Sequence, residues 1–169
     1  MAPRLAALTV VGVLAATAAL GACGADEDDT AGYGHVEVSD LPDDGAGHFT
    51  AEPAPITGRL VLHENGCVNV LVDGVERHPL WPDGTTVVDE GEGGTGNGRY
   101  VVTFSTGVTL HADPTAGDSF TAQGVVDDAA VPLAQSDAQG KVGSLIVYCE
   151  APGEPVAFAD AATIARVEG

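Results

Sequence analysis

Residues 58–84 read GRLVLHENGCVNVLVDGVERHPLWPDG, and this stretch decides the fold. Two strand-like runs rich in Val and Leu, 58–64 and 67–73, flank the pair Asn65-Gly66. That pair favours a two-residue type I′ hairpin turn, in which both central residues need a positive φ. A second turn signal, Asp73-Gly74, follows at once. The pattern predicts short antiparallel strands joined by tight turns.

Further strand candidates follow at short intervals, separated by Gly, Pro, Asn or Asp. They are 75–81, 85–88, 99–105, 108–111, 119–126, 144–148, 156–158 and 163–167. No helical period longer than two turns interrupts them, although 127–135 accommodates one short helical turn beside Pro132. Turn signals at this spacing predict an all-β domain, a small antiparallel barrel or sandwich.

Parts of this region resemble small β domains of uncharacterised secreted bacterial proteins. In those domains a Gly-Cys pair opens a strand and a Trp-Pro-x-Gly turn ends a later one, as Gly66-Cys67 and 81–84 would here. The run GDSFTAQG (117–124) resembles a Gly-Asp-led strand found later in such barrels. The resemblance implies a small barrel, with the OB (oligonucleotide/oligosaccharide-binding) shape as one form, and it implies no binding activity.

The first 23 residues, MAPRLAALTVVGVLAATAALGAC, have the three parts of an export signal. Arg4 supplies a positive start, 5–20 are apolar, and small residues precede Cys23. The apolar run is shorter than the roughly 20 residues that span hydrocarbon as a helix, and acidic residues follow it. We therefore expect a signal peptide rather than a permanent transmembrane helix.

The run Leu20-Gly21-Ala22-Cys23 resembles the lipobox of bacterial lipoproteins. The resemblance implies cleavage before Cys23 and a diacylglyceryl group on its thiol. It implies attachment to the membrane through this lipid, at the outer face of the cytoplasmic membrane. Two acyl chains hold a protein stably on a bilayer, whereas one binds only marginally. The resemblance covers these residues alone and implies no activity.

Three regions are expected: a signal peptide (1–22), a lipidated and disordered acidic linker (23–55) and the β domain (56–169). The linker is rich in Gly, Ala, Asp and Pro and has no sustained apolar period. As a flexible coil it would reach about 30 Å. Its histidines, His35 and His48, are interpreted as incidental.

Two cysteines remain once Cys23 carries lipid. Cys67 and Cys149 are then an even pair in an exported domain, and in an oxidising compartment such a pair is expected to form a disulfide. A catalytic or metal-binding cysteine pair is the alternative.

The charge of the chain bears on its partners. Six Lys and Arg face 25 Asp and Glu, which gives a formal net charge of −19. Such a chain repels phosphate backbones, so nucleic-acid binding is not expected. The acidity is interpreted as a source of solubility, and a monomer is expected.

The short runs that resemble catalytic or cofactor-binding motifs lack residues or flanking elements that those motifs require. HENGC (63–67) has Cys67 where a zinc-protease motif needs its second His, and Asn65-Gly66 favours a turn where that motif needs a helix. GEGGTG (91–96) precedes a strand rather than the helix that a dinucleotide site requires. No P-loop or Gly-x-Ser-x-Gly motif is present. No cofactor is predicted.

Two metal hypotheses stay open. The acidic loop at 89–98, with Asp89, Glu90 and Glu92, offers oxygen ligands for Ca²⁺. His63, His78 and His111 lie on or beside predicted strands and would bind Cu or Zn if the strand register brought them together. Partly exposed polar positions are the simpler interpretation of all these residues.

The sequence thus favours a membrane-anchored binding or structural module over an enzyme. The alternative is an exported hydrolase or a Ca-, Cu- or Zn-binding protein that uses clustered carboxylates or histidines. Trp81 is the first candidate for an exposed binding patch, although a lone Trp in a small barrel more often belongs to the core.

Overall fold

The computed structural model describes residues 34–42, 47–90 and 99–168. The strands of these residues are β1 (Val36–Glu37), β2 (Ala54–Leu62), β3 (Val68–Val72), β4 (Val75–Trp81), β5 (Thr86–Asp89), β6 (Tyr100–Thr103), β7 (Thr109–Ala112), β8 (Ser119–Val126), β9 (Gly153–Ala157) and β10 (Ala165–Arg166). The helices are η1 (Val38–Asp40), α1 (Leu133–Ser136), α2 (Lys141–Cys149) and η2 (Ala161–Thr163), where η marks a 3-10 helix. Cys23 and the glycine motifs of 91–96 lie outside the described residues.

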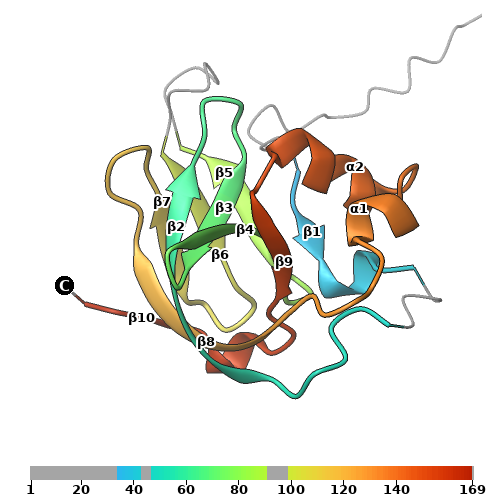
Figure 1. The fold of residues 1–169 in the computed structure, drawn as a ribbon. Coiled ribbons are helices and arrows are strands. Elements are labelled where there is room, and N and C mark those ends of the chain that lie inside the picture. The colour runs from blue at the N-terminus through green and yellow to red at the C-terminus, as the bar shows by residue number, and fades with distance from the viewer. Residues whose placement is uncertain (1–33, 43–46, 91–98, 169) are drawn as a thin grey trace, which may run out of the picture.

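Five strands form a closed circuit, which confirms the expected all-β barrel (Figure 1). β2 pairs with both β3 and β8, and β3 pairs with β4, all antiparallel. β9 closes the circuit because it lies antiparallel to β8 and parallel to β4.

A second sheet is inserted in the chain between β4 and β8. It is a three-stranded antiparallel meander in the order β5-β6-β7. Its buried residues Tyr100, Val102 and Leu110 belong to the same apolar core as the barrel residues Leu60 and Val70. The two sheets therefore share one core.

Four aromatic rings fill the centre of that core. Trp81 stacks on Phe158 with centroids 5.4 Å apart, and Phe104 and Phe120 lie at 5.5 and 6.1 Å. All four are at most 2% exposed. Gly58 is paired with Phe120, and a Cβ at Gly58 would come within 2.8 Å of that ring, which explains a glycine inside β2. The hypothesis that Trp81 belongs to an exposed binding patch is therefore wrong, because Trp81 is a core residue.

The two predicted hairpin turns differ in type. At Asp73-Gly74 both φ angles are positive, 51° and 79°, and Val72 pairs with Val75, so this is the two-residue turn. At Asn65-Gly66 only Gly66 has a positive φ, 82°. The His63 N–H donates to Cys67 O and the Gly66 N–H donates to His63 O. A longer loop with one left-handed residue thus replaces the predicted type I′ turn.

The strand predicted at 144–148 is wrong, because these residues lie in α2. The run SLIVYC is rich in residues that favour strands. However, Val142, Leu145, Ile146 and Cys149 have the spacing of one helix face, and Val142 and Cys149 are buried. Val147, between these positions, is 61% exposed. The short helical turn expected at 127–135 is confirmed as the start of α1, just after Pro132.

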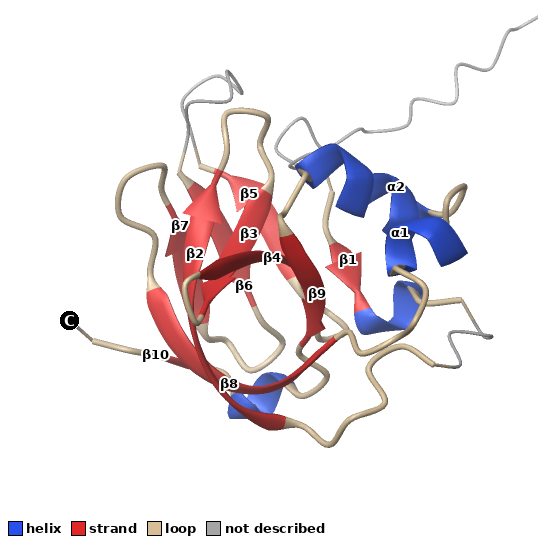
Figure 2. Cartoon of the chain, viewed as in Figure 1, coloured by secondary structure: helices blue, strands red, loops and turns tan. Residues whose placement is uncertain are grey.

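The disorder expected up to residue 55 is also wrong for the described residues. β1 pairs in parallel with β4, and Val36 is fully buried beside Leu80 and Val142. The ammonium of Lys141 lies 2.6 Å from a carboxylate oxygen of Asp40. Figure 2 shows α1 and α2 together on one side of the strands, next to β1. The apolar residues that pack here, Val36, Val38, Leu41 and Phe49, are scattered among polar ones without a regular period, which gives too little sequence pattern to predict this packing.

The Cys67–Cys149 disulfide is present, as expected. It joins the β2–β3 loop to the end of α2, with Cα atoms 5.6 Å apart and a sequence separation of 82 between the two cysteines. Asn65 reinforces the junction, because its amide donates to Tyr148 O at 3.3 Å.

We predict that replacing both cysteines, Cys67→Ala with Cys149→Ala, lowers the free energy of unfolding by about 4 kcal/mol, because a long loop then regains freedom in the unfolded chain. Urea unfolding of the oxidised wild type and of the double variant measures the difference. Adding a reductant is the control, since it should destabilise the wild type to the level of the double variant and leave the variant unchanged. Equal midpoints for both proteins would remove the structural role of the bond.

Candidate functional site

Buried polar groups gather where β3 and β4 meet the disulfide. Asn69 is fully buried, and its amide donates to Glu76 Oε1 at 2.6 Å and to Cys149 O at 3.2 Å. Glu76 Oε1 also lies 2.5 Å from His63 Nε2. The pairing of β3 with β4, through Val70 and Arg77, brings these polar side chains together. A polar cluster therefore lies under the end of α2.

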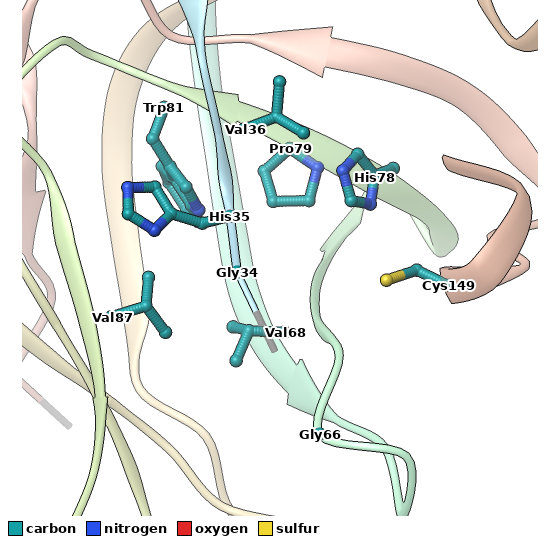
Figure 3. Close-up of a pocket in the computed structure, with 10 residues that line it drawn as sticks. All are labelled: Gly34, His35, Val36, Gly66, Val68, His78, Pro79, Trp81, Val87 and Cys149. Atoms are coloured by element: carbon teal, nitrogen blue, oxygen red, sulfur yellow. The ribbon is translucent and has the colours of Figure 1, made fainter. Parts of the chain in front are cut away.

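His78 opens onto a small pocket beside this cluster (Figure 3). Its walls come from β1, β3, β4, β5 and the disulfide junction, with His35, Val68, Trp81 and Cys149 among the lining residues. The cavity measures about 10 Å³, which is room for about one water molecule. It is too small for an organic ligand.

The imidazole of His78 is 5% exposed, and within the described residues neither ring nitrogen has a hydrogen-bond partner. Burial disfavours the charged ring and lowers the pKa of His78 to about 4. Asn69 Oδ1 is also buried and lacks a partner among these residues. The neutral imidazole is thus part of the folded state at neutral pH.

The three histidines proposed as Cu or Zn ligands have separate surroundings. His63 pairs with Glu76, His111 Nδ1 lies 3.1 Å from Asp118 Oδ2, and His78 is buried without a polar partner. In residues 34–42, 47–90 and 99–168, no group of three His, Cys, Asp or Glu side chains is arranged to hold a metal. Of the acidic loop, Asp89 and Glu90 are described, and Glu92 lies outside the described residues.

His111 belongs to an ion-pair cluster at the edge of the barrel. Asp118 accepts hydrogen bonds from the backbone N–H of His111 at 2.8 Å and from Arg166 Nη2 at 2.8 Å. Partial burial raises the pKa of Asp118, but hydrogen bonds from the backbone and the side chain of His111, with the charges of Arg166 and His111, lower it by more, and the net shift is downward. The carboxylate is held ionised, and it fixes β10 against the chain before β8.

One group of interacting side chains, which contains His48, was not predicted from the sequence. His48 Nδ1 lies 2.9 Å from both carboxylate oxygens of Asp127, and His48 Nε2 lies 3.0 Å from Ser136 Oγ. The interpretation of His48 as incidental is therefore wrong. Sequence separations of 79 and 88 residues leave no local motif that would have revealed it.

Residues 63–67 form a loop and not a helix, in agreement with the rejection of the zinc-protease motif. No helix in the described part of the chain is long and apolar enough to cross a membrane. Comparison of the chain with protein-family models, with curated proteins and with solved structures found no match.

We predict that His78 makes the folded state less stable in acid. The unfolded imidazole binds a proton below its usual pKa of 6.5 and the folded one only below about 4, so the free energy of unfolding falls as the pH drops through this window. The decline attributable to His78 is about 3 kcal/mol.

Urea unfolding at pH 7, 5.5 and 4 measures the effect in the wild type and in the His78→Phe variant, which has no proton to bind there. The His111→Gln variant is the control and should retain the His78 contribution. Equal losses in the wild type and in His78→Phe would contradict the assignment.

Proposed function

We propose that this protein is an exported lipoprotein, anchored by lipid on Cys23 at the outer face of the cytoplasmic membrane, and that it acts as a binding or structural module. The export signal and the lipobox-like run at 20–23 support this proposal. The Cys67–Cys149 disulfide supports it independently, because such bonds persist in oxidising compartments.

The observation that carries the proposed mode of action is the filled interior of the barrel. Trp81, Phe120 and Phe158 occupy its centre, and the cavity beside His78 admits about one water molecule. A ligand therefore has no room inside the barrel, and partners must bind on the outer surface. The net charge of −19 argues against nucleic acid as that partner.

The packing of β1 bears on how far this surface lies from the bilayer. The described residues begin at Gly34, and β1 attaches the chain to β4 two residues later, at Val36. The backbone between Cys23 and Gly34 spans at most about 40 Å when fully extended. The proposed module would therefore meet partners close to the membrane, within the inner part of the envelope.

The test of the anchor is the Cys23→Ala variant of the full chain, expressed in a bacterium that processes lipoproteins. We expect the wild type in the membrane fraction, with an N-terminal peptide that begins at Cys23 and carries the mass of a diacylglyceryl group. The variant should leave the membrane fraction or remain uncleaved. A Gly24→Ala variant is the matched control, since it changes the neighbouring residue and keeps the thiol. An unmodified Cys23 in the wild type would rule the anchor out, and so would a cleaved Cys23→Ala variant that stays in the membrane fraction as fully as Gly24→Ala.

A further inference from the structure

Three side chains form a hydrogen-bonded row like that of an activated serine nucleophile: Ser136 contacts His48, and His48 contacts Asp127. Ser136 lies at the end of α1 and is exposed, whereas the side chains of His48 and Asp127 are only 8% and 1% exposed. The imidazole joins the two oxygen groups through its two nitrogens, at 3.0 Å and 2.9 Å. A nucleophile held by a base, which is in turn held by a buried carboxylate, is the arrangement that activates serine.

The hydrogen-bond network assigns the protons. A carboxylate only accepts, so the nitrogen beside Asp127, Nδ1, must carry the ring proton. Nε2 of the neutral ring is then an acceptor, directed at the hydroxyl of Ser136. Leu133 O, at 3.1 Å from Oγ, competes for the same hydroxyl proton. His48 is therefore in the tautomer that a general base needs.

Independent contacts hold each member in place. Asp127 Oδ1 accepts the Ala129 N–H at 3.0 Å, which fixes the carboxylate. Thr50 donates to both carboxylate oxygens of Asp128 through its backbone N–H and its hydroxyl, at 2.9 and 2.6 Å, and so fixes the segment that carries His48. Leu133, at the start of α1, is buried in the smaller apolar cluster. The geometry is thus preorganised by groups outside the three residues.

The backbone after the nucleophile limits what the site can do. In hydrolases with a nucleophile elbow, the N–H of the residue after the serine stabilises the oxyanion. Here the Asp137 N–H donates to Leu133 O at 3.0 Å. Loss of one oxyanion donor slows acyl transfer by about 100- to 1000-fold. Both the formation and the hydrolysis of an ester on Ser136 should therefore be slower than in such hydrolases, and hydrolysis should be the slower step when the donor carries a better leaving group than a serine alkoxide.

We propose that Ser136 is an acyl-acceptor site, with His48 as its general base and Asp127 as the positioning residue. This goes beyond the proposed function, which assigns no covalent chemistry. Oγ attacks the carbonyl carbon of an ester or thioester donor while its proton passes to His48 Nε2. The bond from that carbon to the alcohol or thiol breaks, and the leaving group takes the proton from His48. The product is an ester on Ser136, and the exposed position suits a donor presented at the surface.

The test is covalent labelling of the intact chain in detergent with a fluorophosphonate and, separately, with p-nitrophenyl acetate. Trypsin cleaves after Lys141, so peptide mass spectrometry separates Ser136 from Ser144, an exposed serine on α2 that serves as an internal control. We expect the adduct on Ser136 to form at least about 100-fold faster than the adduct on Ser144, because a general base accelerates such reactions by at least that factor. With p-nitrophenyl acetate we expect about one equivalent of p-nitrophenol and little turnover.

The Asp127→Asn variant separates chemistry from structure. An amide keeps the size of the side chain and an acceptor for the Ala129 N–H, but its NH₂ favours a proton on His48 Nε2, the wrong tautomer. The rate at which Ser136 is labelled should then fall by at least about 100-fold, while a thermal unfolding transition shows that the domain is still folded. Equal labelling of Ser136 and Ser144 in the wild type, or undiminished labelling in a folded Asp127→Asn variant, would overturn the proposal.

Discussion

The bond between Cys67 and Cys149 is the constraint on which the arrangement of this domain depends. It fastens the long connection between β8 and β9 to the loop between β2 and β3, so α2 is held over the polar face of β3 and β4. Asn69 uses this closeness, because its amide donates to the carbonyl of Cys149. Without the bond, the connection that carries both helices would be joined to the barrel only by apolar packing and a few polar contacts.

The aromatic centre has a second consequence, which concerns where recognition takes place. Barrels that carry a ligand inside keep their interior open. Here Trp81 lies among three phenylalanine rings, and Gly58 gives Phe120 the room that a side chain would take. Stability and an internal binding site would compete for the same volume, and this sequence commits that volume to packing. The loops and the β8–β9 connection are left as the chemically varied surface.

Strands with clear alternation could be predicted from the sequence, since β4 and β8 have the limits that their patterns indicate. Helix α2 was missed because β-branched composition and helical spacing pointed to different structures, and burial against Leu133 and Val36 favoured the helix. The contacts of His48 depend on the closure of the barrel, which brings residues 79 and 88 positions away beside it. Local pattern holds no information on such contacts.

The docking of residues 34–42 and 47–50 decides how tension along the chain enters the domain. A pull from the N-terminal side first meets β1, whose partner β4 is part of the closed circuit and carries Trp81 into the core. Further along, Asp40 is tied to Lys141 and His48 to Asp127. These attachments lie in series ahead of β2, so a pull from this side must break them one after another before it reaches β2.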